Sequence, residues 1–74
     1  MATFEIETIE YSKHGAVKKE FELFGTKNAA IQHMRNKLKD RHGLVQLGKV
    51  KDGEVKLLDD RGIVRQLINI GELV

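Results

Sequence analysis

The chain contains no cysteine. A disulfide, a thiolate metal ligand and a cysteine nucleophile are therefore excluded. The absence fits a reducing compartment, and we expect a cytoplasmic location. A chain of 74 residues without such staples depends on well-formed local structure or on self-association for its stability.

Long apolar runs are also missing. No run approaches the roughly 20 residues of a membrane-spanning helix, and we expect no membrane partner. The first segment, MATFEIETIE, alternates apolar and acidic residues, unlike a signal peptide. With 41% hydrophobic and 32% charged residues, the composition is typical of a globular domain. We therefore expect one small globular domain over residues 1–74.

Catalytic and metal-binding signatures are lacking as well. The single serine, Ser12, lies beside His14 in a predicted turn, and a neighbour in a turn does not activate a nucleophile. The sequence contains no G-x-S-x-G, P-loop or G-x-G-x-x-G motif. His14, His33 and His42 match no short metal-ligand spacing. We expect no catalytic residue, no metal and no cofactor.

Two alternating segments predict an N-terminal β-hairpin. In TFEIETIEY, Phe4 and Ile6 share one face, and the change of phase at Ile9 calls for a bulge near Thr8. A turn over residues 12–15 then joins this strand to AVKKEFELF. The resulting register pairs Ile6 with Phe21, Phe4 with Leu23, Glu5 with Glu22, and Glu7 with Glu20.

Residues 25–43, GTKNAAIQHMRNKLKDRHG, predict one helix. Thr26 is a suitable N-cap, Gly43 is a suitable residue to end the helix, and no proline interrupts it. The apolar residues follow the spacing of one buried stripe. That stripe consists of Ala30, Ile31, Met34 and Leu38.

Residues 44–74 predict three further strands. Asp52-Gly53 is typical of a two-residue type I′ turn, and DDRG at residues 59–62 forms a second turn with Gly62 left-handed. The order is therefore β-β-α-β-β-β: an α+β fold with a single antiparallel sheet and one α-helix packed on one face. The side chains expected to face the helix are Val50, Val55, Leu57, Val64 and Ile68.

Positive charge is concentrated in the helical segment. Residues 25–43 hold five Lys or Arg against one Asp, whereas the whole chain has a net charge of only +2. Arg35, Lys39 and Arg41 are the candidate partner-binding residues of the helix. A simpler explanation is that cations near a helix C-terminus complement the helix dipole, and that their stems cover apolar surface.

The predicted register also aligns Lys49, Lys56 and Arg65 as a basic row across three strands. Like charges opposite each other destabilise a sheet, so another charge should offset them. If the two hairpins are neighbours, the four hairpin glutamates neutralise the row; otherwise the row is free to dock a partner. Those glutamates would bind a divalent cation only by converging on one point. The four are Glu5, Glu7, Glu20 and Glu22.

The six cations predict a small non-enzymatic binding or regulatory module that acts on a protein partner through its charged surface. The alternative is non-specific binding of nucleic acid through the same cations, mostly to phosphate. Aromatic residues, on which bases would stack, are scarce. They are Phe4, Tyr11, Phe21 and Phe24.

The apolar tail LINIGELV suggests a third function, that of an assembly subunit joined through its C-terminal strand. Strand alternation buries only part of such a tail, so the remainder, with Val74 at its end, is free to extend a sheet edge. We select Ile68, Ile70 and Leu73 as the residues of such a homodimer contact.

The order of hairpin, helix and meander resembles that of small proteins of phages and mobile elements, including some anti-CRISPR proteins. The resemblance implies a protein that binds and blocks a larger host machine. It covers the whole chain as architecture alone. Because no sequence motif supports it, no site residue is carried over from it.

Overall fold

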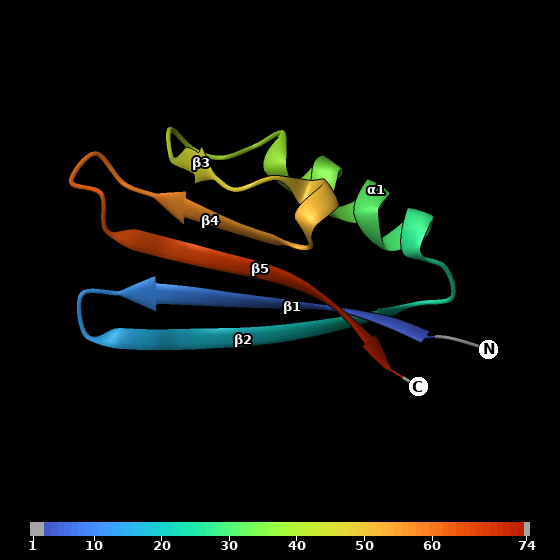
Figure 1. The fold of residues 1–74 in the computed structure, drawn as a ribbon. Helices are drawn as coiled ribbons and strands as arrows, with labels where there is room; N and C mark the ends of the chain where they lie inside the picture. The colour runs from blue at the N-terminus through green and yellow to red at the C-terminus, as the bar shows by residue number, and fades with distance from the viewer. Residues whose placement is uncertain (1–2, 74) are drawn as a thin grey trace.

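The computed structural model describes residues 3–73, so the predicted contribution of Val74 lies outside the described residues. It confirms the α+β class, with one antiparallel sheet and one α-helix (Figure 1). None of its described helices is long and apolar enough to cross a membrane. The elements are β1 (Thr3–Ser12), β2 (Gly15–Phe24), α1 (Lys27–Leu38), β3 (Val45–Leu47), the 3-10 turn η1 (Val50–Asp52), β4 (Glu54–Leu58) and β5 (Val64–Leu73).

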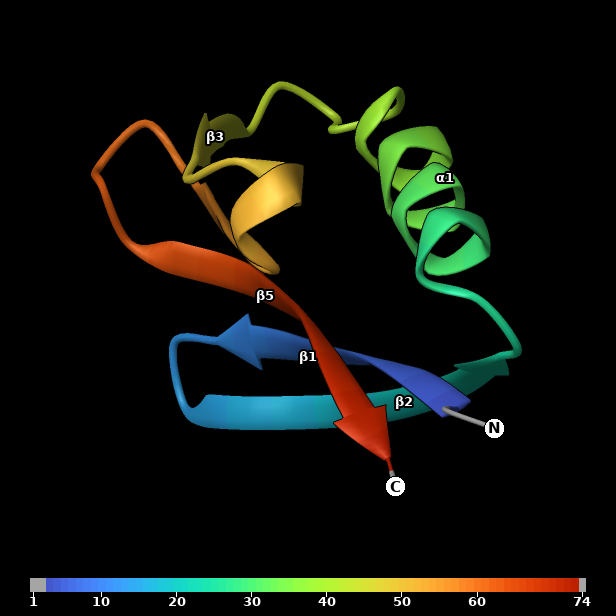
Figure 2. The same cartoon turned by 45° about the vertical axis from the view of Figure 1, so that its right-hand side comes forward.

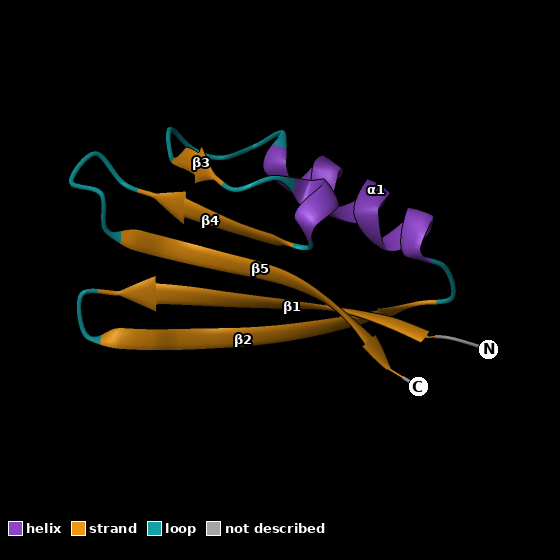
Figure 3. Ribbon diagram, in the orientation of Figure 1, coloured by secondary structure: helices purple, strands orange, loops and turns teal. Residues whose placement is uncertain are grey.

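The sheet has the strand order β2-β1-β5-β4-β3. The last strand in sequence, β5, therefore lies at the centre of the sheet, between β1 and β4 (Figures 1 and 3). It pairs with β1 over residues 66–73 and with β4 over residues 64–69, so residues 66–69 have no free edge with which to extend the sheet into a partner, contrary to the prediction. Ile68 is fully buried and Ile70 packs against the core, which leaves only Leu73 of the predicted dimer residues exposed.

The core lies between α1 and one face of the sheet (Figure 2). Ala30, Met34 and Leu38 recur at a spacing of four residues, so they form one stripe, and all three are buried. Thr26 caps the helix as predicted, because its Oγ1 accepts a hydrogen bond of 3.1 Å from the Ala29 amide. The stripe packs on Ile6, Val55, Leu57 and Ile68 of the sheet.

The helix ends earlier than its basic sequence suggested. Leu38 is its last residue and Lys39 its C-cap, so Lys39 and Arg41 follow the helix rather than lie within it. Gly43 has the expected left-handed φ of 81°, but it does not end the helix. It lies beyond the helix, inside a turn in which the Leu44 amide donates a hydrogen bond to the Arg41 carbonyl. The physical reason is that the buried stripe stops at Leu38, and the chain must turn there to reach β3.

The pairing of β1 with β2 differs from the prediction by one residue. The bulge lies between Glu10 and Tyr11, next to the turn, and not near Thr8. Ile6 therefore lies opposite Glu22 rather than Phe21. Because alternate side chains point to opposite faces, a shift of one residue moves every side chain of β2 to the other face.

This shift corrects the predicted set of core aromatics. Phe21 and Leu23 are exposed on the face away from α1, whereas Phe24 packs against the core. The phase change at Ile9 is resolved without a bulge at Thr8. The pairing of β1 with β5 is continuous from Thr3 to Glu10, so Ile9 simply lies on the sheet face opposite Ile6.

The turn before β4 is also different. Asp52 and Gly53 do not form a two-residue turn; η1 leads into Gly53, which has a φ of 83°. Val50 thereby packs against the core beside α1, as expected, but without the predicted pairing to Val55. Leu47, and not Lys49, lies opposite Lys56.

A second bulge, between Leu57 and Leu58, changes the pairing of β4 with β5. Leu58 lies opposite Val64, and Leu57 opposite Gln66. Val64 was predicted to face the helix, but it is not part of the core cluster. The turn itself is as expected, with Gly62 at a φ of 77°.

Candidate functional site

Arg35, Lys39 and Arg41, the candidate partner-binding residues of the helical segment, line a single groove. The groove lies beside the end of α1, where η1 packs close to the helix and Gln46 of β3 also lines it, and it has a volume of about 420 Å³. We call it the basic groove and define it by its six lining residues. These are Arg35, Leu38, Lys39, Arg41, Gln46 and Val50.

The basic groove combines an apolar lining with positive charge. Leu38, which is 7% exposed, and Val50 are both packed against the core, so they provide a fixed apolar floor. Arg41 Nη1 donates a hydrogen bond of 3.3 Å to Gln46 Oε1, and Gln46 Nε2 in turn donates to the Gly48 carbonyl at 3.0 Å. Arg41 is thereby tied to β3.

The three cations of the groove are not neutralised by the described residues. Within residues 3–73, no carboxylate oxygen lies within 4.0 Å of the charged groups of Arg35, Lys39 or Arg41. All three side chains belong to exposed residues. Interaction with the helix dipole accounts for a cation in the last turn, such as Arg35. It does not account for Arg41, which lies beyond the helix.

The other three predicted cations do not form a row. Lys56 lies between Leu47 and Leu67 on the sheet face away from α1, and its Nζ is 3.9 Å from Glu54. The bulge in the β4–β5 pairing leaves Arg65 without a direct partner in β4, and its Nη1 is 3.7 Å from Asp59.

Lys49 is separate again. It is the residue before η1 and therefore next in sequence to Val50 of the basic groove, but it does not line the groove. The six predicted cations therefore do not form one site. Arg35, Lys39 and Arg41 share a surface. The three cations predicted on the sheet do not.

The four hairpin glutamates are divided between the two sheet faces. Glu5 and Glu7 lie opposite Leu23 and Phe21 on the face away from α1. Glu20 and Glu22 lie on the face that α1 covers. They neither converge on one point nor neutralise a basic row.

Glu22 instead joins the sheet to the helix. Its Oε1 is 3.1 Å from Lys37 Nζ, and that Nζ also donates to the buried Thr8 Oγ1 at 3.1 Å. Its Oε2 is 2.7 Å from His33 Nε2, a close contact whose angle departs from that of a hydrogen bond. Burial raises the pKa of Glu22, but the contacts with Lys37 and His33 outweigh it, so the pKa lies below its usual value.

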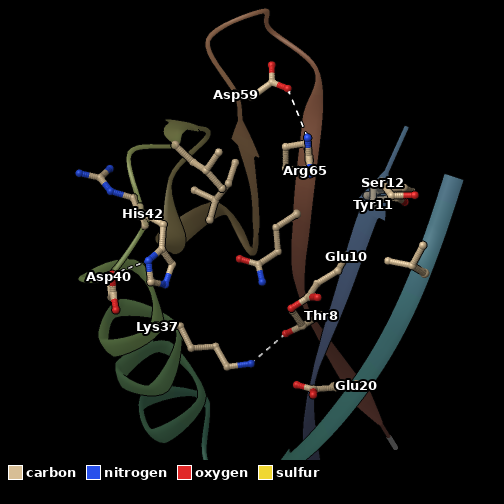
Figure 4. Close-up of a pocket in the computed structure, with 15 residues that line it drawn as sticks. Thr8, Glu10, Tyr11, Ser12, Glu20, Lys37, Asp40, His42, Asp59 and Arg65 are labelled. Atoms are coloured by element: carbon tan, nitrogen blue, oxygen red, sulfur yellow. Dashed lines mark hydrogen bonds and ion pairs between the residues drawn. The ribbon is translucent and has the colours of Figure 1, made fainter. Parts of the chain in front are cut away.

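A larger hollow, of about 680 Å³, lies between the end of α1 and the far ends of β1 and β5 (Figure 4). Its walls carry both signs of charge: Lys37, Arg41 and Arg65 face a similar number of carboxylates, so the hollow has no preference for anions. The carboxylates are Glu10, Glu20, Asp40 and Asp59.

Several polar groups of this hollow are already engaged. Asp59 Oδ1 accepts the backbone amides of Ile63 at 3.0 Å and Arg61 at 2.9 Å. The Ile63 amide is the main reason why the pKa of Asp59 is lowered, against the opposing effect of burial. Ser12 Oγ accepts the amide of His14, and His42 Nδ1 is 3.4 Å from Asp40 (Figure 4).

Sequence reasoning missed Gln46 as a groove residue. It reaches the groove because β3 is an edge strand whose middle residue faces the helix side, a position that no local motif marks.

Comparison with protein-family models, with curated proteins and with solved structures finds no match. The function is therefore argued from the geometry of the chain itself.

Proposed function

We propose that this protein is a small binding module whose basic groove takes an acidic segment of a protein partner. The observation that supports this proposal is the set of three unneutralised cations around an apolar floor. Carboxylates of the partner would pair with Arg35, Lys39 and Arg41. An apolar side chain of the same segment would cover Leu38 and Val50.

The apolar floor favours a protein over a nucleic acid. Phosphate would engage the same three cations, but a backbone needs a longer track of charge, and Lys56 and Arg65 lie elsewhere on the molecule. The groove is also lined by no aromatic side chain on which a base could stack. Nucleic-acid binding is therefore the competing outcome of the test.

The setting that we propose is cytoplasmic, in keeping with a chain that has no cysteine. The order of hairpin, helix and meander, which suggested an accessory protein of a phage or mobile element, is the order of the fold. Blocking a larger protein by occupying its acidic segment is a non-enzymatic activity that a groove of this kind would support.

Fluorescence anisotropy with a labelled peptide of alternating Glu and Leu tests the proposal. We expect binding to the wild-type chain and a loss of roughly tenfold in affinity on Arg35→Glu with Lys39→Glu, since exposed ion pairs contribute about 0.2–1 kcal/mol each. The matched control is Lys13→Glu with Arg61→Glu, which makes the same change in net charge at two exposed turns outside the groove.

The control separates the groove from general attraction. Equal losses in both double variants would show that only net charge draws the peptide, and would contradict the groove. Displacement of the peptide by generic duplex DNA at comparable concentration would favour the nucleic-acid alternative over a protein partner.

A further inference from the structure

The sheet face opposite α1 is a second candidate surface, distinct from the basic groove. We call it the open face. Residues opposite each other in an antiparallel pair lie on the same face, so the register assigns every strand residue to the helix side or to the open face. Both α1 and η1 lie on the helix side, and none of the described elements covers the open face (Figure 2).

The edge strand β2 points exposed apolar side chains to the open face and acidic side chains to the helix side. Phe21 and Leu23 point to the open face and are 54% and 64% exposed, whereas Glu20 and Glu22 point to the helix side. An antiparallel sheet with one solvated face normally shows the reverse, with polar residues facing water. The bulge next to the β1–β2 turn produces this orientation.

The opposite edge strand, β3, shows the same inversion. Val45 and Leu47 point to the open face and are 60% and 55% exposed, while Gln46 between them points to the helix side. At the centre of the open face, Ile9 of β1 lies beside Leu67 of β5 and is only 8% exposed. Exposed apolar side chains therefore lie at both edges of the open face, with charged side chains and the nearly buried Ile9 between them.

We propose that the open face binds a second copy of this chain. The charge of the face supports this occupant: three carboxylates and two lysines nearly cancel, so two open faces do not repel each other. A partner of high charge would find no complement there. The five groups are Glu5, Glu7, Glu54, Lys19 and Lys56.

The area is also sufficient for a dimer. Five strands at a spacing of about 4.8 Å, over roughly 25 Å of strand length, present roughly 600 Å² per copy. Specific interfaces begin at about 1,200 Å² for both partners together. Two sheets stacked about 10 Å apart would thus form a β-sandwich with a helix on each outer side.

Light scattering after size exclusion, from about 1 μM to about 1 mM protein, measures the association. We expect a mass of twice the 8.4 kDa of one chain at the upper end. Phe21→Glu and Leu47→Glu should each return the mass to 8.4 kDa, because each buries a charge between the sheets. Ile63→Glu, at another exposed apolar residue in a turn, should leave the dimer intact.

Circular dichroism confirms that each variant is folded, and Leu23→Lys replaces any variant that is not. A wild-type mass of one chain over the whole range would overturn the proposal, as would a dimer that survives Phe21→Glu and Leu47→Glu. Loss of the dimer on Arg35→Glu with Lys39→Glu, which change only the basic groove, would also contradict it.

Discussion

Met34 is a clear example of stability that resides in one side chain. It is fully buried at the middle of the helix stripe, among the apolar side chains of the sheet. In a chain this small the core is thin, so each fully buried side chain is a large share of it. The exposed neighbour Arg35 makes no comparable contact with the core.

We expect Met34→Ala to lower the free energy of unfolding by about 2–5 kcal/mol, because it removes buried apolar volume and leaves a cavity. Urea unfolding followed by circular dichroism measures the change. Arg35→Ala, one residue along on the solvent side, should change the free energy of unfolding by at most about 0.5 kcal/mol. Similar losses in both variants would argue against a core at Met34.

At the scale of elements, local signals in the sequence were sufficient to predict the order of the helix and strands and the type of each element. Thr26, the apolar stripe of α1 and the turn glycines each act through their near neighbours in sequence. The registers were not predictable to the residue. One extra residue beside the β1–β2 turn inverts residues 18–24 of β2, and the energy of that choice depends on partners such as Lys37 that are distant in sequence.

The same limit applies to the candidate site. Arg35, Lys39 and Arg41 do line one groove: Arg35 and Lys39 are four residues apart at the end of α1, and Arg41 joins them through the turn that follows the helix. Lys49, Lys56 and Arg65 were grouped through two predicted turns, and the structure differs at both: η1 replaces the first turn, and a bulge follows the second. Each pairing with Lys56 is displaced by two residues, to Leu47 in place of Lys49 and to Leu67 in place of Arg65, and this separates the row.

Gly48 provides a prediction for the β3–η1 connection. It has a φ of 97°, and a Cβ at this position would lie 2.7 Å from the Glu54 carbonyl oxygen. We expect Gly48→Ala to lower the free energy of unfolding by about 1–3 kcal/mol, through strain and this backbone clash. Gly25→Ala, where an added Cβ meets open space, is the control for thermal unfolding. An unchanged melting temperature for Gly48→Ala would refute the close approach.

At the scale of the whole molecule, the helix layer and the sheet layer are joined by charge as well as by the core. Glu22 of β2 contacts Lys37 and His33 of α1, and Lys37 also reaches Thr8 of β1. These contacts lower the pKa of Glu22 although burial opposes them. A carboxyl whose pKa is lower in the folded chain stabilises it above the unfolded pKa, and this stabilisation is lost as the pH falls through the folded pKa.

We therefore expect the difference in stability between the wild type and Glu22→Gln to be present at pH 7 and to shrink as the pH falls below 4.5, the ordinary value for this group. Because the side chain is 36% exposed, the difference should stay below about 1 kcal/mol. Urea unfolding at several pH values measures it. The matched control is Glu5→Gln, at a carboxylate with no ion pair among residues 3–73. A difference for Glu22→Gln that stays constant with pH would exclude the linkage.

The central place of β5 has a consequence for how the chain reaches this fold during synthesis. The two hairpin units, β1–β2 and β3–β4, have no strand pairing with each other, and only β5 unites them. During synthesis, one edge of β1 and one edge of β4 remain unpaired until residues 64–73 have left the ribosome. The pairing of Thr3 with Leu73 then joins residues 70 positions apart in the sequence (73 − 3), so the final folding step is non-local and slow.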